Sequence, residues 1–321
     1  MVNRKLLYWG VFFVALGGVL LAGQSPNLDV DLVAQTLRLW PVAIIGLGVG
    51  LLVRRTAFAL PGGLVAAAMP GLLLGGMIVA APTVTQACDI AESADTITQQ
   101  GDFSGPATVD LRLDCGDLAV TTTPGTRWEI QTASVSGVAP EIDASPTSLA
   151  IASVTLDGRH RFPWREPFIS ETYAISLPTG TSLDLSTEVN AGRGRLDLAG
   201  ARLGNLDLQV NAGELRVDLT GATLEALSFE ANAASATVLL PAGGFRATFD
   251  VNGADLNICA PPELGIRLRD DVVLGSRHYS GLIRTGAGWE TPGYLTAPNH
   301  ADVTVSVNVG SVSLNPEGGC K

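Results

Sequence analysis

Arginine, histidine and aromatic side chains gather in two segments of the sequence. Residues 158–168 read GRHRFPWREPF, and the second segment runs from Arg267 to Tyr294. Arg beside Trp or Tyr is typical of contact hot spots, and binding residues tend to lie on loops held by a rigid scaffold. The candidate binding residues are therefore Arg159, His160, Arg161, Trp164, Arg165, Arg277, His278, Tyr279, Arg284 and Trp289. The alternative is that Trp164 and Trp289 only cover the ends of a core.

Catalytic chemistry is not indicated. The chain has three histidines, His160, His278 and His300, which lie far apart in the sequence, and it has no G-x-S-x-G motif. Parallel β-helices can host polysaccharide lyases and hydrolases, but these need convergent carboxylates, or a base beside an Arg or Lys. The Asp residues here alternate with Arg, which is typical of a solvated strand face. We expect no enzymatic activity and no cofactor.

The four cysteines are Cys88, Cys115, Cys259 and Cys320. An even number in the C-terminal part and none in the apolar N-terminal part is typical of two disulfides in an oxidising compartment. Four cysteines allow three pairings, and we expect Cys88–Cys115 and Cys259–Cys320, as staples at the ends of a β array. Zinc binding is the rival interpretation, but no C-x-x-C or nearby histidine supports it, so we expect no metal site.

Charge is distributed unevenly along the chain. Up to Pro82 only seven residues are charged, whereas the part from Cys88 onward carries 15 Lys and Arg against 29 Asp and Glu. A domain this acidic is poorly suited to binding phosphate backbones. We therefore expect no nucleic-acid partner.

The first 82 residues contain three apolar runs, which predict transmembrane helices at about 6–22, 37–53 and 57–80. The lipid bilayer would then be a partner of the chain. Two alternatives are a cleaved signal peptide for the first run and a re-entrant hairpin for the second and third. Arg4, Lys5, Arg54 and Arg55 flank the spans, and the positive-inside rule places them in the cytoplasm. The expected location is the cell membrane, with several passes, a cytoplasmic N-terminus and an extracytoplasmic C-terminal domain at 83–321.

Internal repeats dominate that C-terminal domain. Asn190, Asn211, Asn232 and Asn252 recur in similar contexts (VNAG, VNAG, ANAA, VNGA), at steps of 21, 21 and 20 residues. Each is followed by a short strand of alternating character and by a turn, and a second strand precedes the next Asn. Two strands per repeat of about 21 residues predict an all-β domain built as a parallel β-solenoid, clearest at 189–260. An antiparallel sandwich is the alternative.

The inward residues of the solenoid can be predicted from the alternation. We expect them to be Leu196, Leu198, Val217, Leu219, Val238 and Leu240, with Arg195, Asp197, Arg216 and Asp218 pointing outward. The repeated Asn could form a hydrogen-bonded ladder along the axis, or could simply occupy a turn that needs a left-handed backbone. Weaker copies extend the array, at residues 114–120 and at 307–312, which looks like a last rung.

Two groups of residues carry a family resemblance. Tyr8-Trp9-Gly10 and the run LWPVAIIGLG at 39–48 resemble the transmembrane region of LiaI/LiaF-type bacterial envelope-stress proteins. The Asn-Ala-Gly repeats and the ending GWETPGY at 288–294 resemble the adhesin-like toastrack β-solenoid of the same group. The resemblance implies a sensory or regulatory role at the cell envelope, often beside a membrane histidine kinase, and carries over no catalytic residue.

Two functions remain open from the sequence. The first is a non-enzymatic, membrane-anchored protein that senses or regulates envelope stress through its β-solenoid, with a histidine kinase or another membrane regulator as partner. The second is an adhesive or structural module that binds envelope polysaccharide or another copy of itself.

Overall fold

The structure is a computed structural model that describes residues 4–23, 64, 67–69, 71–72, 95–134, 140–153, 170–286 and 288–320. The chain divides into two compact units. One comprises Met1–Ala87 with Arg161–Glu166, and the other comprises Cys88–His160 with Pro167–Lys321. The second unit contains the whole β architecture.

The N-terminal unit corrects the predicted membrane architecture. Its described helix is α1 (Arg4–Gly23), and no helix among the described residues is long and apolar enough to cross a membrane. The prediction of N-terminal transmembrane helices, and of a multi-pass membrane location built on them, is therefore wrong. An apolar run spans a membrane only if it forms one continuous helix that is both long enough and apolar enough. The helix α1 does not meet these two conditions. The run 37–53 and most of 57–80 lie outside the described residues.

The described residues of the second unit form β-strands and one short 3-10 helix, η2 (Tyr294–Thr296). Its strands are β1 (Asp95–Asp102), β2 (Ala107–Leu113), β3 (Gly116–Thr123), β4 (Arg127–Ser134), β5 (Glu141–Ser145), β6 (Ser148–Ala152), β7 (Glu171–Pro178), β8 (Ser182–Val189), β9 (Gly192–Asp197), β10 (Arg202–Asp218), β11 (Thr223–Leu239), β12 (Phe245–Val251), β13 (Ala254–Cys259), β14 (Leu264–Tyr279), β15 (Ile283–Thr285), β16 (Gly288–Glu290) and β17 (Asn299–Leu314).

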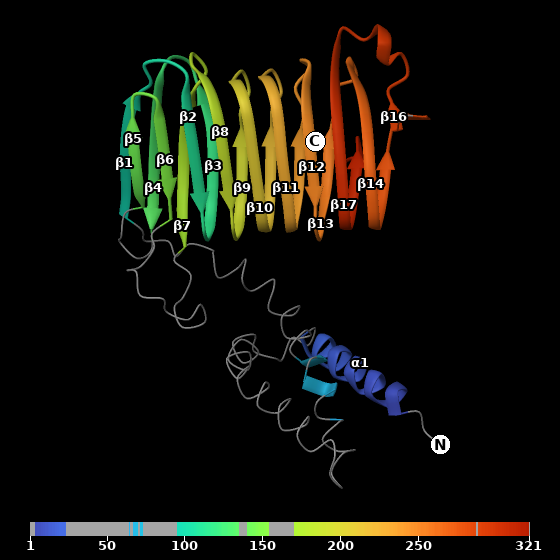
Figure 1. Cartoon of the computed structure of the whole chain (residues 1–321). Coiled ribbons are helices and arrows are strands. Elements are labelled where there is room, and N and C mark those ends of the chain that lie inside the picture. Colours follow the sequence, from blue (N-terminus) through green and yellow to red (C-terminus); the bar gives the residue numbers. More distant parts are fainter. Residues whose placement is uncertain are drawn as a thin grey trace. The chain divides into compact units, whose positions relative to one another are not determined.

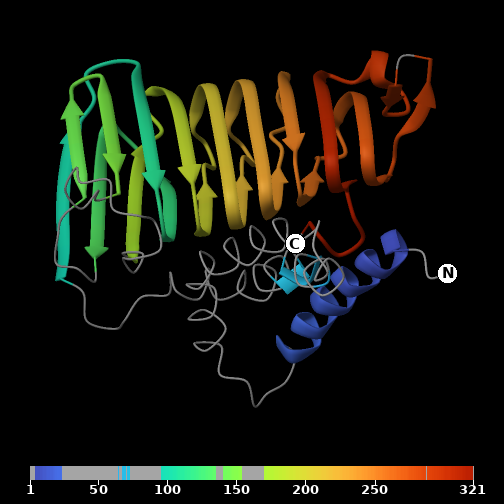
Figure 2. The ribbon, with the colours of Figure 1, turned by 60° about the horizontal axis from the view of Figure 1, so that its bottom comes forward.

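These strands form a two-faced parallel β-solenoid (Figures 1 and 2). Each coil contributes one strand, or half of a long strand, to each face. The first half of β10 pairs in parallel with β8 and β11, and its second half pairs with β9 and β11. Arg216 is the register partner of both Arg195 and Thr237, as the 21-residue repeat predicts. The parallel β-solenoid part of the predicted fold is thus confirmed.

The core lies between the two faces and follows the predicted alternation. The six side chains predicted to point inward are all at most 3% exposed. The rings of Phe229 and Phe249, on the neighbouring strands β11 and β12, lie side by side with 5.8 Å between their centroids and a tilt of 45°. Burial of apolar surface on both inner faces stabilises the array at roughly 25 cal/mol per Å².

Chain order and spatial order differ at both ends of the solenoid. The coil β2–β3 lies between β6 and β7 on one side and β8 and β9 on the other. At the other end, β17 lies between β12–β13 and β14, so β14 forms the outermost coil. Residues 307–312 are therefore a rung as predicted, but not the last one.

An asparagine ladder runs along one corner of the solenoid. Asn211 Nδ2 donates to Asn190 Oδ1 at 2.5 Å, and Asn232 Nδ2 donates to Asn211 Oδ1 at 2.7 Å. The remaining steps join Asn252 to Asn232, Asn308 to Asn252 and Asn190 to Asp114. Every amide donates in the same direction, and the Asp114 carboxylate accepts the last bond. The prediction of a hydrogen-bonded ladder is therefore confirmed, and the alternative of a simple turn residue is not.

The left-handed backbone belongs to glycines beside the ladder and not to the asparagines. Gly116, Gly192, Gly213 and Gly310 have φ between 119° and 133°. A Cβ on Gly213 would run into the carbonyl oxygen of Gly192, its neighbour on the next coil. The ladder asparagines have no positive φ. The turn therefore uses glycine for its backbone shape and asparagine for its hydrogen bonds.

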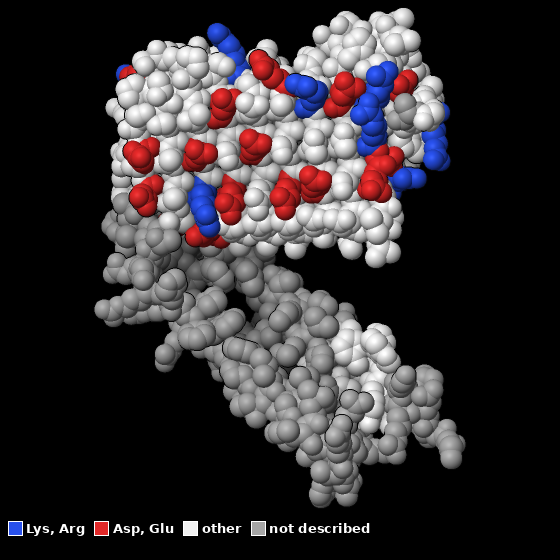
Figure 3. Space-filling model, in the orientation of Figure 1, with Lys and Arg blue, Asp and Glu red and all other residues white. Residues whose placement is uncertain are grey.

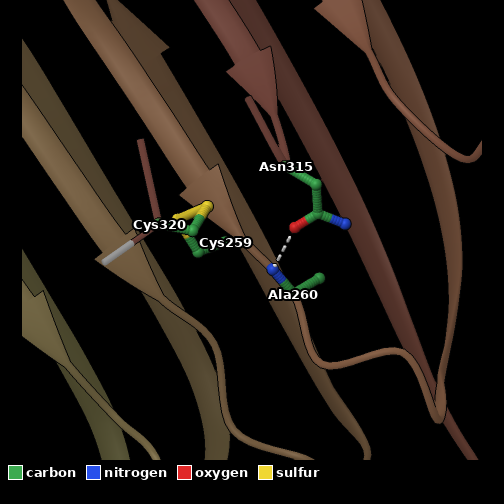
Figure 4. Close-up of a disulfide and its surroundings, with 4 residues drawn as sticks. All are labelled: Cys259, Ala260, Asn315 and Cys320. Atoms are coloured by element: carbon green, nitrogen blue, oxygen red, sulfur yellow. Dashed lines mark hydrogen bonds between the residues drawn. A yellow bond between two sulfur atoms is a disulfide. The ribbon is translucent and has the colours of Figure 1, made fainter. Parts of the chain in front are cut away.

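A disulfide fastens the C-terminus to the array (Figure 4). Cys259, at the end of β13, bonds Cys320 over a sequence separation of 61 residues, as predicted. Asn315 Oδ1 accepts a hydrogen bond from the Ala260 amide at 2.7 Å beside it. By the chain-entropy argument, closing a loop of this length contributes about 4 kcal/mol. Cys115 is also disulfide-bonded, and Cys88, its predicted partner, lies outside the described residues.

Replacing a central ladder residue should destabilise the solenoid. Asn232→Ala removes two ladder bonds and leaves the amide groups of Asn211 and Asn252 without that partner. We expect a loss of about 2 kcal/mol in the free energy of unfolding, measured by denaturant titration. Ser228→Ala, at an exposed position of the same strand, should change it by less than about 0.5 kcal/mol. Equal effects of the two substitutions would contradict the ladder's role.

Substitution of a turn glycine should destabilise the solenoid more than substitution of a ladder asparagine. Gly213→Ala places a side chain at φ 119° against the backbone of the adjacent coil, so we expect a loss of about 2–4 kcal/mol. Gly243→Ala is the matched control, because a Cβ there meets open space and its φ is not positive. Thermal unfolding followed by circular dichroism distinguishes them, and a stable Gly213→Ala variant would show that the turn can change shape.

Candidate binding site at the outermost C-terminal coil

The second predicted segment forms the outermost coil of the solenoid. β14 runs along both faces and turns a corner near Val273, with β17 paired along its inner side. On its outer side, β16 pairs only with Arg267 and Leu268 and is itself paired with β15. A short hairpin thus covers one end of β14.

Asp270 draws three of the candidate side chains together. Its Oδ2 atom accepts a hydrogen bond from Arg277 Nη1 at 2.7 Å and from the Tyr279 hydroxyl at 3.3 Å. Its Oδ1 atom accepts a hydrogen bond from Trp289 Nε1 at 3.1 Å. The Asp270 side chain is 9% exposed, so these donors replace the water that a carboxylate needs. We call these four residues the Asp270 cluster.

Aromatic contacts complete the cluster. The rings of Tyr279 and Trp289 meet edge to face at 5.3 Å, and the Arg284 guanidinium lies 5.8 Å from the centre of the Trp289 ring. Both aromatic side chains pack against the hydrophobic core. Burial raises the pKa of the Tyr279 hydroxyl, and the Asp270 charge and hydrogen bond raise it further. The cluster therefore closes the open end of the coil while keeping the Arg277 side chain 40% exposed.

His278 does not join this cluster. It follows Arg277 on β14 and points to the other side of the strand, where its Nε2 atom lies 3.1 Å from the Ser280 hydroxyl. Arg159, His160, Arg161, Trp164 and Arg165 all lie outside the described residues. The structure therefore assembles Arg277, Tyr279, Arg284 and Trp289 and leaves His278 apart from them.

A second ion pair lies near the Asp270 cluster and joins β14 to β16. Arg267 Nε donates to Glu290 Oε1 at 2.8 Å, and its guanidinium lies 4.4 Å from the centre of the Tyr294 ring. The Glu290 hydrogen bond is the main cause that raises the pKa of Arg267. These contacts hold the hairpin and η2 against β14.

Two features of this coil escape sequence reasoning. Asp270 takes an inward position of the alternating run, on the side of Ile266 and Leu268, but the sequence gives no sign of the three donors that it collects. At the corner, Val273, Leu274 and Val309 are 66%, 68% and 50% exposed, and we call them the apolar corner. The consecutive Val272-Val273-Leu274, which interrupts the alternation, is the one signal that could have pointed to this corner.

One face of the solenoid carries more carboxylates than basic groups, as Figure 3 shows, and Arg112 on β2 and Arg246 on β12 are among the basic ones. Its carboxylates project from β5, β2, β8, β10, β11 and β12: Glu141, Asp143, Asp110, Glu188, Asp207, Glu230 and Asp250. We call it the acidic face. Glu230 and Asp250 are register partners on adjacent strands, which lie about 4.8 Å apart. Like charges placed opposite each other destabilise a sheet.

No metal centre accompanies these carboxylates. Within the described part of the chain, no group of three or more His, Cys, Asp or Glu side chains is placed to hold a metal ion. Neither Glu230 nor Asp250 forms an ion pair there, although Glu230 accepts a hydrogen bond from Asn232.

Comparison with known proteins identifies the array. Residues 89–240 match the family described as the N-terminal domain of toast_rack, DUF2154. This part of the chain is a toast-rack domain. The match ends before β12, so the Asp270 cluster lies beyond it, and the match does not extend to the LiaI/LiaF specifics of the resemblance. A comparison with curated proteins finds no match.

Solved structures similar to the chain are bacterial and distant in sequence. A protein described as a candidate cell adhesion protein from Clostridium sporogenes has 13% identity and a TM-score of 0.45, covering 69% of this chain and 99% of its own. A candidate adhesin from Bacteroides fragilis has 12% identity and a TM-score of 0.36, covering 70% of this chain and 99% of its own.

Removing the Asp270 carboxylate should loosen the end of the toast-rack array. We expect Asp270→Ala to lower the free energy of unfolding by about 2 kcal/mol, because it leaves three partly buried donors unpaired. It should also lower the pKa of Tyr279, which burial alone then keeps above its ordinary value of 10.0. Difference absorbance titration against Tyr279→Phe measures that pKa.

The pH dependence follows from the same shift. A raised pKa keeps Tyr279 neutral in the folded protein after the unfolded chain has ionised, so its contribution to stability is lost as pH rises above about 10. Tyr279→Phe should remove that part of the alkaline loss. Asp271→Ala, next to Asp270 but exposed, is the control and should leave the Tyr279 titration nearly unchanged. An Asp270→Ala variant with an unaltered Tyr279 pKa would contradict the cluster.

Proposed function

We propose that the protein is a non-enzymatic regulator of the bacterial cell envelope, in which the toast-rack array senses envelope stress by binding a regulatory protein partner. A histidine kinase is the partner that the family resemblance suggests. The observation that carries the proposal is the juxtaposition of Glu230 and Asp250 on the acidic face. Carboxylates that repel each other on adjacent strands cost stability, and a bound cationic surface offsets that cost.

The chemistry of the acidic face restricts the partner. An acidic surface attracts basic protein segments and repels nucleic acid and anionic polymers. The face is rigid, because its carboxylates stand on strands whose other sides are buried. A rigid array of charges favours fast, salt-dependent association more than high affinity. A sensor that must release its partner when conditions change needs this kind of contact.

The disulfide and the fold support a binding role. Cys259–Cys320 is the kind of bond that persists in an oxidising compartment. Solenoids use extended surfaces as contact sites. A second candidate function is adhesion to envelope polysaccharide, which is favoured by the opposite face. There Ser235, Thr237, Asn257, Ser311 and Ser313 present hydroxyl and amide groups in adjacent strands.

Neutralising the acidic face should weaken the stress response. We expect Glu230→Gln with Asp250→Asn to reduce the transcriptional response to a cell-wall-targeting antibiotic by about 3–10-fold, the effect of losing one or two ion pairs in the contact. The measurement is a reporter of the response in cells that carry the variant in place of the natural chain. Crosslinking and mass spectrometry of the same cells should show the partner lost.

The matched control removes two carboxylates from the opposite face. Glu214→Gln with Asp218→Asn changes the net charge equally and keeps the Asp218 oxygen that accepts the Thr220 amide hydrogen bond. This control should respond like the natural chain. An unchanged response in a strain that lacks the protein would sink the regulatory function, and retained binding to envelope polysaccharide in both variants would favour adhesion.

A further inference from the structure

The outer side of β14 is an unpaired strand edge. β17 pairs with β14 from Leu264 to Tyr279, whereas β16 pairs on the other side only at Arg267 and Leu268. Gly288, at the start of β16, lies beside Arg269. Within the described residues, the stretch 270–279 therefore has no strand on its outer side. Unpaired edges of this kind are templates for pairing with another chain, and natural proteins usually cover or shorten them.

The free edge turns a corner and is apolar there. Residues 269–272 lie on one face and 275–279 on the other, because their partners on β17 do so. The apolar corner lies between the two stretches, with Val273 and Leu274 about two-thirds exposed. A straight peptide can pair with only one of the stretches. A partner that pairs along the whole edge needs the same bend.

A second copy of this chain has that bend. Rotation by 180° about an axis through the corner, between Val273 and Leu274, exchanges the two stretches and sets residues 270–277 of the two edges antiparallel. The pairing stops there because β16 already occupies the edge at Leu268. The apolar corners then meet, with Val273 of each copy opposite Leu274 of the other. This is the geometry of an isologous interface, in which one patch complements itself.

The charges on the edge are compatible with this pairing. Arg269, Asp270 and Asp271 precede the corner, and Arg277 and His278 follow it. Antiparallel pairing about the corner sets Asp270 of each copy opposite Arg277 of the other, and Asp271 opposite Ser276. The Arg277 side chain is 40% exposed and can therefore reach across while it keeps its bond to Asp270.

We propose that two copies of the protein associate end to end through the free edge of β14, around the apolar corner. The inference rests on the edge, the corner and their charges, and not on the proposed function. The dimer would continue the β array across the two-fold axis and would cover Val273, Leu274 and Val309. The Asp270 cluster would then lie beside the interface and hold the edge in shape.

Sedimentation of the full chain over about 1–100 μM tests the association. We expect a concentration-dependent monomer–dimer equilibrium in the natural chain. Leu274→Lys should raise its dissociation constant at least about 10-fold, because a charge replaces an apolar contact at the axis. Thr248→Lys is the matched control, at an exposed position on β12, and should leave the equilibrium unchanged. Leu274→Ser serves as a second variant if the lysine disturbs folding.

A cysteine at the axis tests the geometry. A mixture of Val273→Cys and Leu274→Cys chains should form an intermolecular disulfide under mild oxidation, because these positions lie opposite each other, whereas Val273→Cys mixed with Ser235→Cys, on another coil, should not. A natural chain that stays monomeric throughout the concentration range would overturn the proposal. So would a dimer that is insensitive to both Leu274 variants, or crosslinks from residue 273 to a different protein. If Leu274→Lys weakens the dimer but the stress response stays normal, the dimer and the regulatory function do not depend on each other.

Discussion

The requirement that successive coils follow the same path governs this structure. The asparagine ladder enforces it, because each amide reaches its neighbour only when two coils are in register. Glycines with positive φ enforce it as well, since they let one backbone pass close to the next. A slip of one residue would turn the buried leucines outward and the charged rows inward. The acidic face is a consequence of this register, which places Glu230 beside Asp250 although both are negatively charged.

The end strands of any β-solenoid have edges that can pair with another chain. The two ends of this solenoid limit such pairing in different ways. At the N-terminal end, β1, β4 and β7 pair antiparallel, and β5 pairs antiparallel with β6. Reversal of strand direction breaks the repeat and ends the solenoid. At the C-terminal end, the short β16 is the only strand among the described residues that pairs with the outer side of β14, and the Asp270 cluster closes the core behind it. The core is thereby protected from water while a stretch of backbone edge stays open.

The repeats between residues 189 and 260 could be read from the sequence because chain neighbours there are also spatial neighbours. Leu196, Val217 and Val238 repeat at a constant step, so one alternation pattern predicts the burial of all three. The end coils break that relation. Asp114 bonds Asn190 across 76 residues, and Asn308 bonds Asn252 across 56. Local patterns contain no information about such insertions, although the motifs themselves, Asp-Cys-Gly and Asn-Val-Gly, were visible.

The candidate site was predictable in composition but not in arrangement. Arg277, Tyr279 and Trp289 stand out by type, whereas Asp270 does not, because it lies in a run of charged residues. Alternation along β14 turns Asp270 inward with Ile266 and Leu268. A carboxylate is stable there because β14 is the outermost coil, where Trp289 fills the space and donates to it. The apolar N-terminal runs led to the wrong prediction of transmembrane helices, because their arrangement also could not be read from residue types. Hydropathy describes the residues, and a membrane span depends also on the helix that they form.

The order of coils makes the site depend on the C-terminus. β14 precedes β17 in the chain, yet it is joined to the array through β17 rather than through β13. Residues 264–279 therefore have no parallel partner until residues 299–314 are in place. The Cys259–Cys320 disulfide holds the segment after β17 against the end of β13 and so favours that insertion. The last residues of the chain thus stabilise the Asp270 cluster and the free edge, although they contribute no side chain to either.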